Sequence, residues 1–237
     1  DLFGLDEATI QTPSDYTIQA APWSAKVRFA EEKAVLGLFL TGHPIDDYAD
    51  EMKHIAPKRL AQLLSEVHPE RRKIFVKAAG LAIDIGSRQN KQGKTRGFAI
   101  LDDKTARLEV SAYRDIYDQY QAIFTANYHD ELLIAEGHLA MDNYLNVPLL
   151  TVERIYPISQ ARKLLKITLQ KNQHSIEKLA SLLETAKGGQ TQVCIDYYTD
   201  HARATLLLGD QWHIQATDDF LYKLYGWLGK RAINVGY

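Results

Sequence analysis

The chain has 237 residues, of which 46% are hydrophobic and 24% are charged, and its formal net charge is −2. This composition is that of an ordinary globular protein, and the near-neutral charge excludes a protein that binds nucleic acid through overall basicity. No apolar run approaches the roughly 18 residues of a membrane span. Cys194 is the only cysteine, which excludes an internal disulfide framework and a thiolate zinc cluster. We therefore predict a cytoplasmic protein with roughly one to three compact units.

The first 22 residues form an acidic leader. They hold four acidic residues and no basic one, they show no sustained hydrophobic period, and they begin with Asp1 rather than Met. We expect this leader to be flexible and the chain to be a fragment or a processed product. Leu2 and Phe3 are its only adjacent pair of large apolar residues. They indicate either local packing or a short linear motif that inserts into a partner's pocket.

Residues 23–71 are predicted to form a small helical segment. Apolar residues recur at spacings of three and four over 23–40, at Trp23, Val27, Ala30, Ala34 and Leu38. Pro44 suits the first turn of a second helix. A third helix is expected over 57–68, with Leu60, Leu63, Leu64 and Val67 turned inward.

Residues 72–159 have the pattern of one small closed β-barrel. Strands are predicted over 73–89, 96–103 and 108–114, a helix over 115–124, and two further strands over 131–142 and 146–158. Three strands, a helix and two strands is the order of an OB-fold, a five-stranded Greek-key barrel. Gly80 lies in the middle of the first strand, which must bend sharply to serve both sides of such a barrel.

Residues 160–237 are predicted to form a compact β-α-β-β-α-β domain of the split βαβ kind. The pattern indicates a strand over 164–170, a helix over 175–189 that Gly188 and Gly189 end, and a hairpin around Asp200 and His201. A short strand over 212–216, a helix over 218–229 and a final strand complete the domain. The fold class is therefore multidomain α+β, with a helical segment, an OB-fold barrel and this last domain.

No group of residues in the sequence has the pattern of a catalytic or metal site. Asp102 and Asp103 are adjacent carboxylates, but neighbours on a strand point to opposite faces, so we expect a strand-to-turn cap rather than a Mg²⁺ site. The eight histidines show no ligand spacing, and no Gly-rich phosphate loop or nucleophile elbow is present. We predict neither a catalytic residue nor a cofactor for this chain.

The outer face of the barrel is the candidate site for single-stranded nucleic acid. OB-folds bind oligonucleotides over strands 2 and 3, beside the first hairpin loop. If Ala99, Leu101, Leu108, Val110 and Ala112 face inward, then Phe98 and Tyr113 face outward, where they can stack on bases. The side chains that we assign to this site are Arg88, Lys91, Lys94, Arg96, Phe98, Arg107, Tyr113 and Tyr144. Two alternatives stay open: Phe98 is core and the lysines only solubilise a hairpin, or protein covers this face.

Tyr222, Tyr225 and Trp227 place much aromatic surface on one short helix. Most of it is expected in the core, but one face of this helix can form a protein-docking patch, because aromatic residues are enriched at interface centres.

Four segments carry a resemblance to a known family. They are DLFG at 1–4, EEKAVLGLFLTGHPIDDY at 31–48, GFAILDDKTARLEV at 97–110 and the stretch from Gly209 to Tyr237. In this order and spacing the chain resembles the C-terminal region of the α subunit of bacterial DNA polymerase III, over essentially its whole length. The resemblance implies that the catalytic carboxylates, and the Mg²⁺ that the parent polymerase uses, belong to upstream domains.

The resemblance also implies three partners. Asp1, Leu2 and Phe3 match the end of the family's sliding-clamp motif, whose glutamine would lie before Asp1. The family's OB-fold is assigned to single-stranded template. Its last domain binds the τ subunit of the clamp loader, and we assign that contact to Trp212, Tyr222, Tyr225 and Trp227. The chain departs from the family in two places, with Gln92 where an arginine is frequent and Ala106 where a glycine is frequent.

Three functional hypotheses follow. The first is a non-catalytic replicase module that holds template, clamp and τ. The second is a docking scaffold whose barrel face meets protein rather than DNA. The third is an autonomous enzyme.

Overall fold

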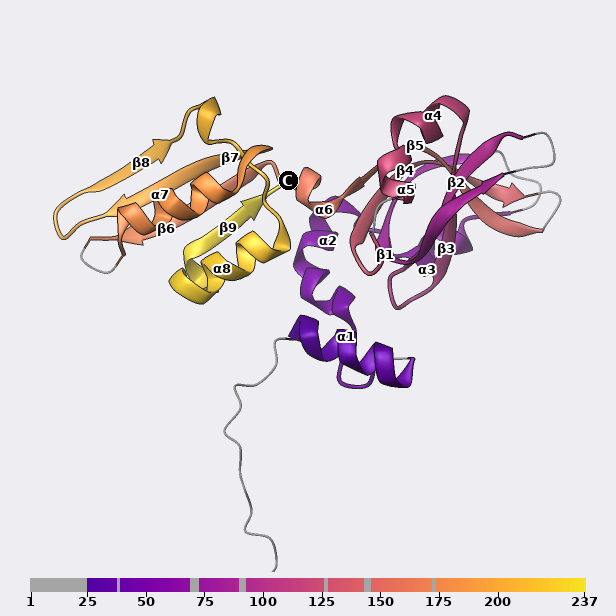
Figure 1. Cartoon of the computed structure of the whole chain (residues 1–237), viewed down its shortest axis with the longest axis horizontal. Coiled ribbons are helices and arrows are strands. Elements are labelled where there is room, and N and C mark those ends of the chain that lie inside the picture. Colours follow the sequence, from indigo (N-terminus) through magenta and orange to yellow (C-terminus); the bar gives the residue numbers. More distant parts are fainter. Residues whose placement is uncertain are drawn as a thin grey trace, which may run out of the picture. The chain divides into compact units, whose positions relative to one another are not determined.

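Figure 1 shows the computed structural model, which describes residues 25–37, 39–68, 73–89, 93–125, 128–142, 146–171 and 174–237. The chain divides into two compact units, Asp1–Pro44 and Ile45–Tyr237. In the first, helix α1 (Ala25–Leu36) forms where the spacing predicts a helix. Among the side chains of α1 that the structure describes, Phe29 is buried, whereas Val27 is 45% exposed. Phe39 packs edge-on against Phe29, with the ring centroids 6.0 Å apart.

The larger unit contains the predicted OB-fold, which is confirmed. Strands β1 (Ile74–Gln89), β2 (Thr95–Asp102), β3 (Arg107–Tyr113), β4 (Leu132–Asp142) and β5 (Val147–Pro157) form a closed barrel in the order β1-β2-β3-β5-β4. All neighbours are antiparallel except β3 and β5, which close the barrel in parallel. The predicted helix between β3 and β4 is two short helices, α4 (Arg114–Gln119) and α5 (Gln121–Thr125), separated at Tyr120.

Gly80 has the role predicted for it. Strand β1 pairs with β4 through residues 74–81 and with β2 through residues 81–89, so Gly80 lies where the strand passes from one partner to the other. A Cβ at Gly80 would lie 3.0 Å from the backbone nitrogen and oxygen of Asp102. Only a residue without a side chain permits this approach of two backbones.

The inward set expected from strand alternation is confirmed. Ala99, Leu101, Leu108, Val110 and Ala112 are all fully or almost fully buried and belong to one core cluster inside the barrel. Helix α3 (Leu60–Ser65) adds Leu60 and Leu63 to this cluster, and α4 and α5 add Tyr117, Ile123 and Phe124. Side chains of these helices therefore complete the hydrophobic core of the barrel.

A second cluster covers the outside of the barrel. The 3-10 helix η1 (Pro44–Tyr48) and helix α2 (Ala49–Ile55) contribute Ile45, Met52 and Ile55. These side chains pack with Leu81, Leu132 and Ile134 from the faces of β1 and β4 that point away from the interior. The segment before the barrel is thus held against the barrel wall by apolar burial.

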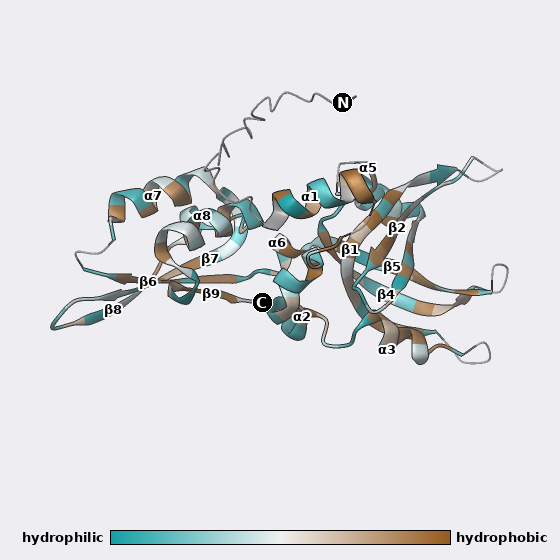
Figure 2. Ribbon diagram, turned by 90° about the horizontal axis from the view of Figure 1, so that it is seen from below, coloured by the Kyte–Doolittle hydropathy of each residue, from teal (hydrophilic) through white to brown (hydrophobic). Residues whose placement is uncertain are grey.

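The last domain is a four-stranded sheet with two helices. The chain passes through α6 (Ile158–Ala161) into β6 (Leu164–Gln170), α7 (Ile176–Thr185), β7 (Lys187–Tyr198), β8 (Arg203–Leu207), η2 (Asp210–Trp212), α8 (Asp218–Leu228), η3 (Lys230–Ala232) and β9 (Ile233–Gly236). The sheet order is β8-β7-β6-β9. Figure 2 shows α7 and α8 on the same side of this sheet, and residues of both share one core with β6 and β7.

The succession of elements is as predicted, but the split arrangement is wrong. The parallel strands β6 and β7 are direct neighbours, because β8 and β9 add to the two outer edges instead of inserting between them. The strand expected over 212–216 is also wrong. Only Ile214 there forms isolated bridges, to Lys187 and Thr191, and residues 210–212 form a 3-10 turn.

The predicted end of helix α7 was misplaced for a physical reason. The helix ends at Thr185, and Gly188 and Gly189 already belong to β7. A Cβ at Gly189 would lie 2.0 Å from the carbonyl oxygen of Ile214, so this glycine serves a close backbone approach rather than a helix stop. Ile176, the first residue of the helix, is 57% exposed.

Candidate nucleic-acid interface

Strand register brings two arginines face to face on the outer wall of the barrel. Arg88 on β1 is paired with Arg96 on β2, and Arg96 is paired with Tyr113 on β3. Side chains directly opposite each other in an antiparallel pair have Cβ atoms about 4.5–5.5 Å apart, and like charges in that position are destabilising. The arrangement is therefore unfavourable for folding unless anionic or aromatic groups compensate.

Phe98 lies on the same face, but its ring is covered. The guanidinium carbon of Arg88 is 4.0 Å from the ring centroid, and a Cβ on the opposite Gly86 would lie 3.2 Å from the ring. Only 7% of Phe98 is exposed. A base can reach the outer face of this ring only if Arg88 moves aside, and a guanidinium is itself a planar surface on which a base can stack.

Arg96 is held by three acceptors that meet its Nη1 atom. The Glu109 Oε1 atom lies 3.2 Å away, the Ser111 Oγ atom 2.8 Å and the Tyr113 hydroxyl oxygen 3.4 Å. A guanidinium carries five N–H donors, and Nη1 holds two of them. Arg96 is thus oriented by its neighbours while the rest of its fork can still donate to a phosphate oxygen.

The other predicted residues fall into three groups. Lys94 and Tyr113 are exposed, Tyr113 by 39% of its surface. Arg107 is exposed, but its Nε atom donates to Asp102 Oδ2 at 2.8 Å, which ties it to the far end of β2. Lys91 and Tyr144 lie outside the described residues. The structure therefore brings together Arg88, Arg96, Phe98 and Tyr113, and it places Arg107 apart from them along the strands.

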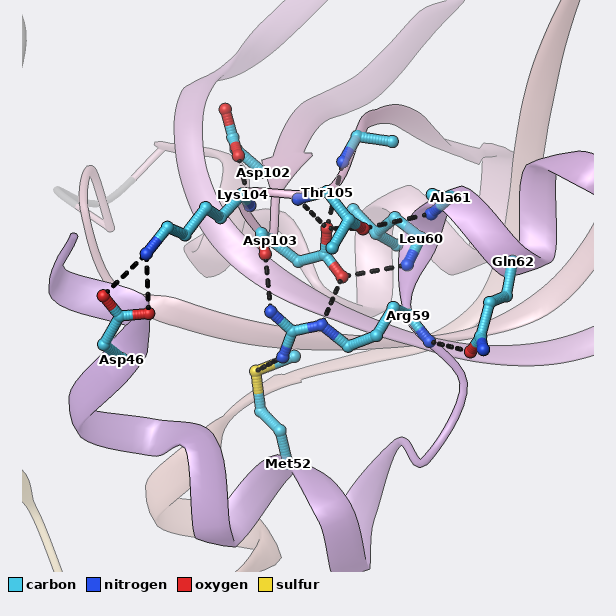
Figure 3. Close-up of polar contacts among 11 residues, drawn as sticks. Asp46, Met52, Arg59, Leu60, Ala61, Gln62, Asp102, Asp103, Lys104 and Thr105 are labelled. Atoms are coloured by element: carbon cyan, nitrogen blue, oxygen red, sulfur yellow. Dashed lines mark hydrogen bonds and ion pairs between the residues drawn. The ribbon is translucent and has the colours of Figure 1, made fainter.

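Asp102 and Asp103 are turn caps, as predicted. Asp102 Oδ1 accepts from the backbone of Lys104, which has a positive φ of 73°. Asp103 is fully buried, and its carboxylate accepts from Thr105 and Ala106 in its own turn. It also accepts from the Leu60 backbone at 2.9 Å and lies 3.1 Å from the Arg59 Nε atom (Figure 3). This carboxylate therefore joins the β2–β3 turn to the start of α3, and its donors leave no position for a metal ion.

Within the part of the chain that the structure describes, no three His, Cys, Asp or Glu side chains lie together in a way that would hold a metal ion. Among the same residues, no helix is long and apolar enough to cross a membrane.

The four aromatic residues assigned to τ lie in two places. Trp212 and Trp227 pack against the core of the last domain, and each has a lysine over its ring, Lys187 at 4.0 Å and Lys178 at 4.8 Å. Tyr222 and Tyr225 line a hollow beside α8. Asp1, Leu2 and Phe3, assigned to the clamp, lie outside the described residues.

Comparison with known proteins bears on both the barrel and the last domain. A family model described as DNA polymerase III subunit alpha, C-terminal domain, matches residues 178–229. The DNA polymerase III subunit alpha of Vibrio cholerae is 30% identical over 243 residues, and that of Escherichia coli K12 is 31% identical over 244. Each alignment covers 99% of this chain. The chain belongs to the DNA polymerase III α-subunit family, as its C-terminal region.

The chain spans about a fifth of the length of these α subunits, since the alignments cover 20% of each. Among solved structures, the second OB-fold domain of replication protein A from Methanococcus maripaludis aligns with 43% of this chain and 93% of its own, at 11% identity and a TM-score of 0.31. The OB assignment of this α-subunit region rests on the strand order of the barrel itself.

Sequence reasoning missed a buried ionic network in this α-subunit region. Arg162, which follows α6, is only 1% exposed. Its Nε and Nη2 atoms donate to Glu51 at 2.9 and 2.8 Å, Nη2 also lies 2.7 Å from Asp218, and Nη1 donates to the Ala216 carbonyl. Burial disfavours its charge, but the two carboxylates outweigh that effect and raise its pKa. No local pattern around Arg162 marks it as buried, because its partners are far away in sequence.

Proposed function

We propose that this chain is a non-catalytic positioning module of a replicative DNA polymerase, which binds single-stranded template DNA across strands β1, β2 and β3 of its barrel. The observation that carries the proposal is the pairing of Arg88 with Arg96 beside Phe98 and Tyr113. Two guanidinium groups placed opposite each other on an open strand face favour an anionic ligand that passes between them.

The stacking groups support a single strand rather than a duplex. Tyr113 is exposed, and the guanidinium carbon of Arg88 lies over the Phe98 ring, 4.0 Å from its centroid. Each stacked base contributes about 1–3 kcal/mol and tolerates any sequence, because every base has a π-face. Template that moves past a polymerase needs such sequence-independent contacts.

The remaining parts of the proposal rest on family membership. The bond-making groups and their Mg²⁺ would belong to the part of the α subunit outside this chain, in the cytoplasm of the cell. Asp1, Leu2 and Phe3 would contribute to sliding-clamp binding. The last domain, through Tyr222, Tyr225, Trp212 and Trp227, would bind the τ subunit of the clamp loader.

One observation favours the second candidate, a scaffold whose barrel face meets protein. Glu109, Ser111 and Tyr113 already contact Arg96, and Asp102 contacts Arg107. Arginines with internal acceptors are also suited to a polar protein interface.

Salt dependence of DNA binding separates these candidates. We expect labelled oligo-dT to bind the whole chain, with an affinity that falls as salt rises, because counterions are released from each contacted phosphate. Replacing Arg88, Lys94 and Arg96 together with alanine removes three cationic contacts, so the slope of log K against log salt should flatten by about 2.

The matched control removes the same charge elsewhere. Lys171, Lys223 and Arg231 are exposed side chains of the last domain, and replacing all three with alanine should leave the salt slope unchanged. Equal slopes for the two triple variants would reject the assigned DNA surface and favour the scaffold. Nucleotide incorporation by the isolated chain with Mg²⁺ would reject the non-catalytic assignment.

A further inference from the structure

A hollow of about 510 Å³ lies between the helical segment and the last domain of the larger unit. Residues of η1 and α2 form one side, and residues of α8, η3 and β9 form the other. Its volume falls within the range of about 300–1,000 Å³ that is usual for binding pockets. It is therefore large enough for more than one side chain of a ligand.

Acidic side chains outnumber basic ones in this hollow. Asp47, Asp50, Glu51 and Asp218 line it, against Arg162 and Lys230. Glu51 and Asp218 share the single guanidinium of Arg162, so the floor carries one net negative charge. Asp47 lies exposed at the rim. Negative groups surrounded by walls of low polarity focus the field into the hollow and attract cations.

Four tyrosines form much of the remaining lining, namely Tyr48, Tyr222, Tyr225 and Tyr237. The Tyr48 hydroxyl donates to Asp218, and the Tyr222 hydroxyl donates to Asp47 at 3.3 Å. Burial and the nearby Asp47 carboxylate raise the pKa of Tyr222 to about 12, so its ring stays neutral. Neutral phenol rings beside carboxylates bind a guanidinium or ammonium group through both cation–π and ionic attraction.

We propose that this hollow, lined by Asp47, Tyr222 and Tyr225, is the docking site for an arginine or lysine side chain presented by a segment of a partner protein. The charge excess selects the cation, and Leu221, Ile233 and Val235 in the same lining accept an apolar neighbour of that cation. The inference rests on the proposed τ contact and specifies its face and its chemistry. Trp212 and Trp227 have no part in this site.

The experiment measures binding of purified τ subunit to the whole chain by calorimetry. We expect Asp47→Asn and Tyr222→Ala each to weaken binding about tenfold, because each removes one group that contacts the cation. Both residues are exposed, so the thermal midpoint should stay close to that of the wild type. Matched controls are Asp210→Asn, an acid with 97% of its side chain exposed, and Phe75→Ala, an aromatic that is 58% exposed on the barrel.

A second step identifies the basic side chain. Overlapping 12-residue peptides that cover τ are tested against the wild type, and each Arg or Lys of the peptide that binds is replaced by citrulline or glutamine. One replacement should weaken binding at least tenfold. Equal binding of τ to wild type, Asp47→Asn and Tyr222→Ala, or a binding peptide without a basic residue, would overturn the inference but leave the τ contact intact. Failure of τ to bind the wild type would overturn both.

Discussion

Two buried charges in this molecule are stabilised in different ways. Asp103 in the barrel turn is 0% exposed, and Arg162 beside the last domain is 1% exposed. Most of the hydrogen bonds to Asp103 come from backbone or side-chain groups of its own turn and the start of α3. Arg162 is paired instead with the side chains of Glu51 and Asp218, which come from two other helices.

The difference shows which contacts can respond to a ligand. Backbone donors cannot be moved without unfolding the turn, so Asp103 fixes a local shape. Glu51 and Asp218 lie on separate helices and both line the hollow, so a cation that binds there as proposed would change how the two carboxylates share Arg162. A buried ion pair costs desolvation and is strongly destabilising when one partner is removed.

The largest expected effect breaks the Arg162 network. Arg162→Met leaves Glu51 and Asp218 without their counter-charge and should lower the free energy of unfolding by about 3–5 kcal/mol. Urea denaturation measures this loss. Arg154→Met, at a side chain that is 65% exposed, should cost less than about 1 kcal/mol. A triple variant that adds Glu51→Gln and Asp218→Asn should recover part of this loss in the free energy of unfolding. If it recovers none, the loss comes from packing rather than from charge.

A somewhat smaller effect is expected at Asp103. Asp103→Asn keeps the shape of the side chain but replaces one carboxylate oxygen with an NH₂ group. Buried backbone N–H groups that donated to that oxygen then lose their acceptor. The cost should be about 2–3 kcal/mol by urea denaturation. Asp46→Asn, which removes an exposed pair with Lys104, is the matched control and should cost well under about 1 kcal/mol. Similar losses for both variants would contradict the role of Asp103 as the cap that joins the turn to α3.

The smallest effect is a pH dependence at Asp196, a residue of β7 that is 3% exposed. Hydrogen bonds from Thr205 and Lys166 lower the pKa of this carboxyl to about 2, against about 3.9 in an unfolded chain. Because the folded-state pKa is depressed, its contribution to stability is present above pH ~4 and is lost as the pH falls toward 2. Thermal midpoints of wild type and Asp196→Asn should therefore converge over that range, while Asp200→Asn should follow the wild type. Parallel curves for wild type and Asp196→Asn would refute this.

Much of the barrel was predictable, because alternation along a strand fixes which side chains point inward. Ala99, Leu101 and Val110 follow that rule, and Gly80 follows from the bend that closure demands. The cover over Phe98 was not predictable, since it depends on the register that places Arg88 beside the ring. The role of Gly189 was not predictable either, because Ile214, whose backbone it approaches closely, is far from it in the sequence.

The hollow could not be predicted from the sequence either, because residues far apart in the chain form it. Its floor joins Arg162 to a residue 111 positions earlier, and no spacing pattern extends so far. The tyrosines of α8 were recognisable as an aromatic face, but the acids opposite them come from η1 and α2. Sequence therefore indicated one wall of the hollow and not its charge.

The parallel pairing of β3 and β5 has a consequence for the proposed DNA contact. Only three residue pairs join these two strands, from Glu109–Leu149 to Ser111–Thr151. Strands β4 and β5, in contrast, are paired along almost their full length. Glu109 and Ser111 are also the residues that hold Arg96. In the DNA complex proposed above, a strand that draws Arg96 outward would also displace Glu109 and Ser111, so binding of the template would loosen the shortest strand pairing of the barrel.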